Sequence, residues 1–230
     1  MAKRPGTLAL LGGGEWTKPC ADLDGRLLEA AGRADVLVLP TAAAFEHPER
    51  VVDRAAAWFE KLGGKVQFLP VLNRRDAESD ANVTAARDAA FVYIADGSPL
   101  HLRSVLKGSA LWDAIVHMYE RGGVLAASGA GATVVCDPMV DPRGGAYTVG
   151  LGLVSSLAVF PYHGSAADHI RERSVDLLSA NAVLVGIDEG TALVRAGDDP
   201  WEVAGGGRVT VYRKGAKPKT SKPGTPVDLS

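Results

Sequence analysis

Cysteine is scarce in this sequence, which has only Cys20 and Cys136 among its 230 residues. Two cysteines cannot form the dense disulfide framework of small secreted domains, so we expect two unpaired thiols and a reducing, cytoplasmic environment. Cys136 is interpreted as a small core residue, because no basic neighbour marks it as a reactive thiolate. The opening segment MAKRPGTLALLGGGEW has an apolar run too short and too rich in glycine for a signal peptide or a membrane span. We therefore expect no membrane partner.

An excess of charge of either sign is also missing. The chain carries 25 lysines and arginines against 27 aspartates and glutamates, a net charge of -2. This balance supplies no field that would attract a polyanion, and no local basic patch stands out, so nucleic acid is excluded as an expected partner. The remaining composition, 47% hydrophobic and 23% charged, is that of a folded globular domain.

Motifs for metals and organic cofactors are absent as well. The five histidines and two cysteines include no pair with the spacing of metal ligands. The glycine-rich segment LLGGGEWTKP, residues 10–19, lacks both the G-x-G-x-x-G order of dinucleotide sites and the G-K-[ST] ending of P-loops. We interpret it as a close-packed turn that lines a site, and we predict no metal and no cofactor.

Short apolar runs alternate with longer amphipathic stretches through the first two thirds of the chain. The runs are typical of strands buried on both faces, and the stretches between them have helical spacing and end in glycine. This alternation predicts an α/β fold with a doubly wound, mostly parallel sheet flanked by helices. The five expected strands lie at residues 7–11, 35–40, 65–70, 90–95 and 123–128.

The last third of the chain has a different pattern. Short strand-like runs surround a single expected helix near residues 165–180, which predicts a partly antiparallel extension of the sheet. From Lys214 onward, KGAKPKTSKPGTPVDLS has lysines and prolines but almost no core-forming residues. We therefore predict a single α/β domain over residues 1–213 and a flexible tail over residues 214–230.

The segment GGVLAASGAGATVVCDP, residues 122–138, carries the most specific signal. An expected strand ends at Ser128 and is followed at once by a turn and a helix made of small residues. Segments of this kind expose the nucleophile of α/β hydrolases, because the residue at the tip has a positive φ and the N–H after it faces the oxyanion. The sequence therefore predicts a nucleophile elbow here.

Several segments resemble one known family in their order and spacing, namely LGGGE, LPTAAA, ADGSPLHL, SGAGA, YHGSAADHIRERSVDLL and GIDEGTALV. Between about residues 8 and 211 the chain resembles the serine peptidases that include cyanophycinase and aspartyl dipeptidase (peptidase E), a family related to the class I glutamine amidotransferases. The resemblance implies a class I glutamine amidotransferase-like fold, a monomer or homodimer, and a small peptide or amino acid as partner. It also implies hydrolysis of aspartyl or β-aspartyl peptide bonds by an attacking serine.

The family elbow has the pattern G-[ST]-S-A-G-A, with the attacking serine at its centre. When the closing residues 130–132 are aligned, the tip in this chain is Gly129, and Ser128 lies one position too early. Adjacent side chains of an extended strand point to opposite faces, so Ser128 is not an obvious replacement. Two alternatives stay open: a shifted elbow that uses Ser128, and an engineered inactivation in which Gly129 replaces a serine.

Other family positions can be matched residue by residue. Gly97 matches the second glycine of a G-G-[DN]-Q pattern, so the resemblance implies an oxyanion pocket formed by the N–H groups of Gly97 and Ala130. Asp96 departs from that pattern, and its carboxylate would oppose negative charge there. His163 matches the histidine of the family's D-x-H-F segment and would act as the base.

The acidic member of the site has several candidates. Glu189 in GIDEGTALV matches the residue that orients the histidine in the aspartyl dipeptidase branch, and Asp188 precedes it. Other branches take their acid from the segment after the elbow, where this chain has Asp137 and Asp141. We favour Glu189.

Arg171 and Arg173 resemble the family's R-x-R segment and would bind a substrate carboxylate, although a solvated helix face paired with Glu172 and Asp176 is the alternative. The sequence as a whole predicts a degenerate relative that keeps the fold and binds a small amino acid or peptide without cleaving it. The alternative is an active serine-type hydrolase of aspartyl or β-aspartyl bonds that uses Ser128.

Overall fold

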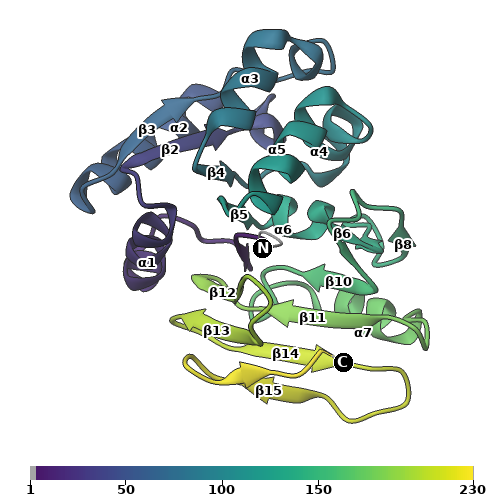
Figure 1. The fold of residues 1–230 in the computed structure, drawn as a ribbon. Coiled ribbons are helices and arrows are strands. Elements are labelled where there is room, and N and C mark those ends of the chain that lie inside the picture. Colours follow the sequence, from purple (N-terminus) through teal and green to yellow (C-terminus); the bar gives the residue numbers. More distant parts are fainter. Residues whose placement is uncertain (1–3, 230) are drawn as a thin grey trace.

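The computed structural model describes residues 4–229 and contains an eight-stranded central sheet. Its parallel part consists of five neighbouring strands in the order β1, β5, β4, β2 and β3. Figure 1 shows this sheet between helices, as an alternating pattern of strands and helices predicts. The bounds are β1 (Thr7–Leu11), β2 (Asp35–Leu39), β3 (Lys65–Phe68), β4 (Phe91–Ile94) and β5 (Val124–Ser128).

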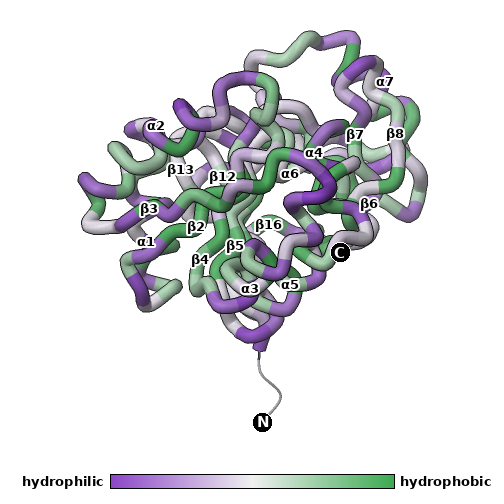
Figure 2. The backbone as a smooth tube through the Cα atoms, turned by 90° about the horizontal axis from the view of Figure 1, so that it is seen from above, coloured by the Kyte–Doolittle hydropathy of each residue, from purple (hydrophilic) through white to green (hydrophobic). Residues whose placement is uncertain are grey.

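Helices cover both faces of this sheet. Leu8 and Leu10 of β1 pack in the cluster that contains α3, α4, α5 and α6, whereas Ala9 and Leu11 pack in the cluster that contains α1 and α2. Because both faces of these strands are covered, their sequences are continuous apolar runs. Figure 2 shows this hydrophobic character along β2, β4 and β5. The helices are α1 (Ala21–Ala31), α2 (Pro48–Lys61), α3 (Asp80–Asp88), α4 (Pro99–Leu106), α5 (Ala110–Glu120) and α6 (Ala130–Val135), with short 3₁₀ turns η1 (Lys18–Cys20), η2 (Thr41–Ala43) and η3 (Asp76–Glu78).

One of the expected strands differs from the prediction. The sequence predicts burial on both faces for residues 65–70, but Lys65, Gln67 and Phe68 of β3 are exposed. The reason is position, because β3 is the last strand at its edge of the sheet and has a neighbour only on the β2 side.

The antiparallel part predicted for the last third is confirmed. β12 pairs with β1 in antiparallel orientation and extends the central sheet, while β10, β11, β14 and β15 form a second sheet in the lower half of Figure 1. The bounds are β10 (Leu157–Phe160), α7 (Asp168–Asp176), β11 (Val183–Ile187), β12 (Thr191–Ala196), β13 (Trp201–Gly205) and β14 (Val209–Tyr212). Two small ribbons lie between α6 and β10, namely β6 (Cys136–Asp137) with β9 (Val154–Ser155) and β7 (Met139–Val140) with β8 (Tyr147–Thr148).

The segment predicted as a flexible tail contains two short strands. β15 (Lys219–Ser221) pairs with β14, and β16 (Pro226–Val227) pairs with β13 at the edge of the central sheet. Val227 is only 5% exposed. A polar, proline-containing segment can be held in this way because β13 and β14 offer unpaired backbone groups at their edges, which composition does not reveal.

Neither a membrane span nor a disulfide is found in the described part of the chain. None of its helices has the length and apolarity needed to cross a bilayer. Cys20 and Cys136 are both buried, and both are free thiols.

Candidate functional site

The candidate site lies where three neighbouring parallel strands end. Strand β5 lies between β1 and β4, so the loops that follow these three strands meet at one edge of the sheet. They contribute Glu15 after β1, Asp96 after β4 and Gly129 after β5. Tyr162 reaches the same place from the segment after β10, and its N–H donates to the Gly12 carbonyl at 2.7 Å.

The turn after β5 has the backbone expected of a strained tip. Gly129 has φ 49° and ψ −105°, a conformation that glycine adopts without the steric cost of a Cβ. Two backbone hydrogen bonds hold it: the Gly129 N–H donates to the Leu11 carbonyl at 3.0 Å, and the Thr133 N–H donates to the Gly129 carbonyl at 3.1 Å. The chain therefore passes directly from β5 into α6.

The two backbone donors expected to form an anion pocket are both engaged by Asp96. Its Oδ1 atom accepts the Gly97 N–H at 2.7 Å and the Ala130 N–H at 2.6 Å. Charge-assisted hydrogen bonds of this kind are roughly twice as strong as neutral ones. Gly97 itself has φ 146° and lies so close to the Ala42 carbonyl that a Cβ would not fit. The carboxylate of the chain thus takes the place that an oxyanion would need.

Asp96 also fills the space above the tip of the turn. A Cβ on Gly129 would lie far inside van der Waals contact with the carboxylate carbon and both oxygens of Asp96. The Asp96 carboxylate thus occupies the space that a side chain at position 129 would need.

Tyr162 is the aromatic residue that faces the turn. Its hydroxyl donates a hydrogen bond to Oδ2 of Asp96. The ring needs Gly13, because a Cβ there would overlap with it. Burial raises the pKa of the Tyr162 phenol, and the hydrogen bond to Asp96 raises it further, so the hydroxyl is a proton donor here.

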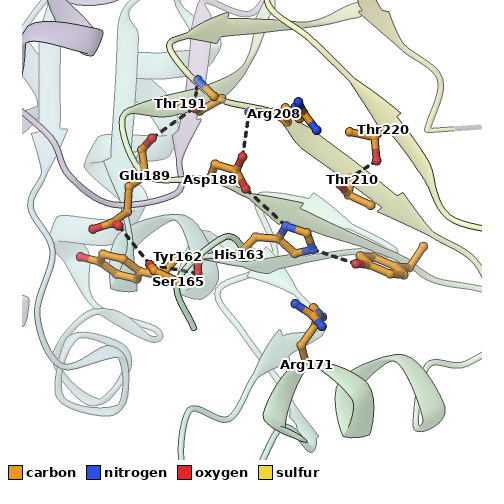
Figure 3. A network of polar contacts seen from close by, with 12 residues as sticks. Tyr162, His163, Ser165, Arg171, Asp188, Glu189, Thr191, Arg208, Thr210 and Thr220 are labelled. Atoms are coloured by element: carbon orange, nitrogen blue, oxygen red, sulfur yellow. Dashed lines mark hydrogen bonds and ion pairs between the residues drawn. The ribbon is translucent and has the colours of Figure 1, made fainter. Parts of the chain in front are cut away.

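The structure does not bring His163 to this turn. Its Nδ1 lies 3.3 Å from Oδ1 of Asp188, and its Nε2 lies 2.7 Å from the Tyr212 hydroxyl. Figure 3 shows the imidazole pointing away from Tyr162, which has a positive φ of 54° where the chain enters a turn. Burial lowers the pKa of His163, and the Asp188 carboxylate opposes that shift in part. Gly186 leaves room for the ring, because a Cβ there would collide with it.

The remaining charged candidates, Glu189, Arg171 and Arg173, are not hydrogen-bonded to the turn or to His163. The carboxylate of Glu189 accepts a hydrogen bond from Ser165 at 3.0 Å (Figure 3), and it is Asp188 that contacts His163. Arg171 forms an ion pair with Asp168 at 2.7 Å. Arg173 is exposed on α7.

Ser128 lies beneath the turn and is fully buried. Its hydroxyl donates to Oε2 of Glu15 at 2.8 Å. Glu15 is itself only 9% exposed, and burial raises its pKa, with the nearby Asp96 charge adding to the shift and the Ser128 hydrogen bond opposing it. Ser128 therefore supports Glu15 and does not face the space above Gly129.

Two cavities open on either side of this group, and both are lined by Asp96, Gly97 and Tyr162. One, of about 210 Å³, extends between α6, β10 and α7. The other, of about 500 Å³, extends toward α2 and includes Glu15 and Glu189. Neither Arg171 nor Arg173 lines either cavity. Within residues 4–229, no three His, Cys, Asp or Glu side chains are grouped closely enough to hold a metal ion.

Sequence reasoning missed two members of the site, Asp96 as a hydrogen-bond acceptor and Tyr162. The signal for Asp96 was its departure from glycine in the G-G-[DN]-Q pattern. For Tyr162, shifting the alignment to the family's D-x-H-F segment by one residue would match Tyr162 to its histidine and His163 to its phenylalanine. That match would have placed the tyrosine, not the histidine, beside the turn.

Comparison with known proteins agrees with this fold. The chain is 29% identical over 210 residues to cyanophycinase from Nostoc sp., covering 84% of this chain and 68% of that protein. It is 26% identical over 223 residues to cyanophycinase from Geminocystis herdmanii, covering 89% and 79%. The crystal structure of a peptidase from an acI-B1 Actinobacterium superposes with a TM-score of 0.89 at 30% identity, covering 100% of this chain and 99% of that one. A putative peptidase E protein from Listeria monocytogenes shares the fold, with a TM-score of 0.66 at 16% identity over 91% and 98% of the chains.

The sequence profile of peptidase family S51 matches residues 8–202, which include the turn at Gly129 and the segments that carry Asp96 and Tyr162. The match therefore covers the whole candidate site. The chain belongs to peptidase family S51.

Proposed function

We propose that this chain is a ligand-binding member of family S51 that does not carry out serine-type peptide hydrolysis. The observation that carries the proposal is the position of the Asp96 carboxylate, which accepts both the Gly97 and the Ala130 N–H and fills the space above Gly129. The nucleophile elbow is then retained as a turn, while its attacking group is absent.

Serine-type hydrolysis requires an attacking oxygen, free donors for the oxyanion and a base within reach. Gly129 supplies no oxygen. The two donors already hold a negative charge, which would repel a second one. The His163 imidazole is bonded to Asp188 and Tyr212, and the group nearest the turn is a phenol. Loss of the serine alone costs about a millionfold in turnover in subtilisin, so residual hydrolysis would be negligible.

Ligand binding is supported by the two cavities that meet at Asp96 and Tyr162. The larger cavity, of about 500 Å³, has the size typical of small-molecule sites, and the smaller one combines an apolar wall with the polar groups of Asp96 and Tyr162. We propose a small amino acid or short peptide as the ligand, in keeping with the peptide chemistry of the family.

Hydrolysis by Ser128 is the second candidate, and the geometry gives it little support. The hydroxyl is fully buried and donates to Glu15, whereas the His163 nitrogens contact Asp188 and Tyr212. An engineered change of a single serine to Gly129 is also disfavoured, because the Asp96 carboxylate occupies the vacated space and so indicates two coupled differences from the family pattern.

A hydrolysis assay tests the proposal. Aspartyl dipeptides and cyanophycin fragments are incubated with the wild-type protein, with Ser128→Ala, with Gly129→Ser and with the pair Asp96→Gly/Gly129→Ser, and released amino groups are quantified. We expect no cleavage by the wild type, by Ser128→Ala or by Gly129→Ser alone. Cleavage by the wild type that disappears in Ser128→Ala would contradict the proposal.

A further inference from the structure

The two cavities beside Asp96 differ in chemistry. The smaller one, of about 210 Å³, has an apolar wall that includes Val140, Phe160 and Ile170. Asp96 is its one ionisable carboxylate, and neither lysine nor arginine lines it. An acidic side chain placed there would lie beside a like charge without a cation, which is unfavourable. A cavity of about 150 Å³ holds benzene, so this one has room for a side chain of the size of leucine or phenylalanine.

The larger cavity is acidic, because carboxylates outnumber cations in its lining. Glu15, Glu46, Asp96 and Glu189 line it, together with two guanidinium groups from α2. Glu15 is the most deeply buried of these carboxylates. Its Oε2 atom accepts from Ser128, and its Oε1 atom lies 3.4 Å from the Asp96 N–H and 3.9 Å from the Arg54 guanidinium, while the backbone of Glu15 itself also contributes a hydrogen bond to the carboxylate. Oε1 thus retains capacity to accept a strong donor such as an ammonium group.

We propose that the ligand is an amino acid or short peptide with an apolar side chain and a free ammonium group. The side chain enters the cavity lined by Phe160 and Ile170, and the ammonium group binds beside Glu15 in the acidic cavity. The two cavities are adjacent, because Asp96, Gly97 and Tyr162 line both of them, and the proposed ligand extends from one to the other past these residues. Arg50 and Arg54 line the acidic cavity and offer partners to the carboxylate of such a zwitterion.

This inference rests on the proposed function and adds a selectivity to it. The family resemblance implies aspartyl side chains as the preferred group. In this chain the arginines matched to the family's R-x-R segment are absent from both cavities. The wall of the smaller cavity therefore favours an apolar side chain over a carboxylate.

Isothermal titration calorimetry with Leu-Ala, Asp-Ala and N-acetyl-Leu-Ala tests the inference on the full-length protein. We expect Leu-Ala to bind at least about tenfold more tightly than Asp-Ala, because the carboxylate would be buried without a partner. We also expect N-acetylation to weaken binding about tenfold, because it removes the charge that faces Glu15. Equal or tighter binding of Asp-Ala, no effect of acetylation, or no binding of any of the three at millimolar concentration would overturn the inference.

Two variants, Ile170→Lys and Glu15→Gln, test which residues cause the differences in affinity. Ile170→Lys places a cation in the wall of the apolar cavity and should shift the preference toward Asp-Ala, a gain that misfolding cannot produce. Leu177→Lys is the matched control, because Leu177 is exposed at the end of α7 and lies outside the cavity. Glu15→Gln should weaken Leu-Ala but not N-acetyl-Leu-Ala. A preference unchanged in Ile170→Lys, or shifted equally in the control, contradicts the assignment.

The same samples separate this inference from the proposed function. Free amino acids are measured after each titration. Cleavage of either dipeptide by the wild type counts against the proposed function. The ratio of the affinities for Leu-Ala and Asp-Ala tests the selectivity, whether or not cleavage occurs.

Discussion

The carboxylate of Asp96 occupies the space that any side chain on Gly129 would need. The two residues follow neighbouring parallel strands, β4 and β5, and the size of the side chain at one position limits the size at the other. A glycine at the tip leaves room for the carboxylate, and the carboxylate in turn satisfies the N–H groups of Gly97 and Ala130. These hydrogen bonds join the loops after β4 and β5.

This relationship predicts strong coupling between substitutions at the two positions. Gly129→Ser alone should lower the free energy of unfolding by about 1–3 kcal/mol, because it overpacks a filled site. Asp96→Gly alone should also destabilise, because it leaves two N–H groups without their acceptor. The pair should be less destabilised than the sum by about 1–3 kcal/mol. Urea unfolding of the four proteins measures the cycle, and simple additivity would refute the coupling.

Asp24 predicts a pH dependence of stability that originates away from the candidate site. It is fully buried on α1, its Oδ2 accepts the Trp58 indole N–H at 2.8 Å, and burial raises its pKa from 3.8 to about 7. The native state then binds a proton that the unfolded state releases between about pH 4 and pH 7. The free energy of unfolding should therefore fall as pH rises through this window, by up to about 4 kcal/mol from this group.

The variant Asp24→Asn isolates that contribution. Asparagine keeps an oxygen for the Trp58 indole and does not titrate, so its advantage over the wild type should grow from pH 4.5 to pH 7.5. Urea unfolding at several pH values within this range makes the comparison. Parallel profiles of the two proteins would mean that Asp24 keeps an ordinary pKa in the fold.

His163 should titrate below the ordinary value for an imidazole, because burial disfavours its charged form. Asp188 partly offsets this effect, so Asp188→Asn should lower the pKa of His163 further. A depressed pKa means that the unfolded state binds the proton more readily, so this group reduces stability as pH falls below about 6.5. An NMR titration of the ring protons gives the pKa directly. A value at or above the ordinary one would contradict the buried environment described for this ring.

The carboxyl-terminal strands should contribute to stability. Truncation after Lys214 removes β15 and β16 and uncovers the edges of β14 and β13, together with the contact surface of Val227. Burying one valine side chain contributes about 2 kcal/mol, which corresponds to about 4–8 °C in Tm for a protein of this size. Thermal unfolding of the truncated chain measures the loss. An unchanged Tm would support the flexible tail that composition predicts.

Much of the fold could be predicted from periodicity, because buried parallel strands leave long apolar runs in the sequence. The positive φ at residue 129 was also predictable, because the chain must turn sharply between a strand and a run of small residues, and glycine makes such a turn without steric cost. The behaviour of the two edge strands could not be predicted from the sequence. The exposure of β3 and the pairing of β16 depend on which strands are neighbours in space.

Within the candidate site, the limit was the direction of single side chains. His163 and Tyr162 are adjacent, and their directions are set by a turn in which Tyr162 has a positive φ, which the sequence does not mark. The resemblance marks Asp96 as a departure from the family pattern, but only the arrangement of the loops after β4 and β5 shows that its carboxylate occupies the space beside Gly129.

Covalent labelling tests the central claim most directly. The wild-type protein is incubated with a fluorophosphonate probe alongside an active serine hydrolase, and adducts are detected by intact-protein mass spectrometry and located by peptide mapping. The structure predicts that the wild-type mass stays unchanged while the control enzyme is labelled. A stoichiometric adduct on Ser128 would show that a serine of this chain attacks as a nucleophile, and it would contradict the account.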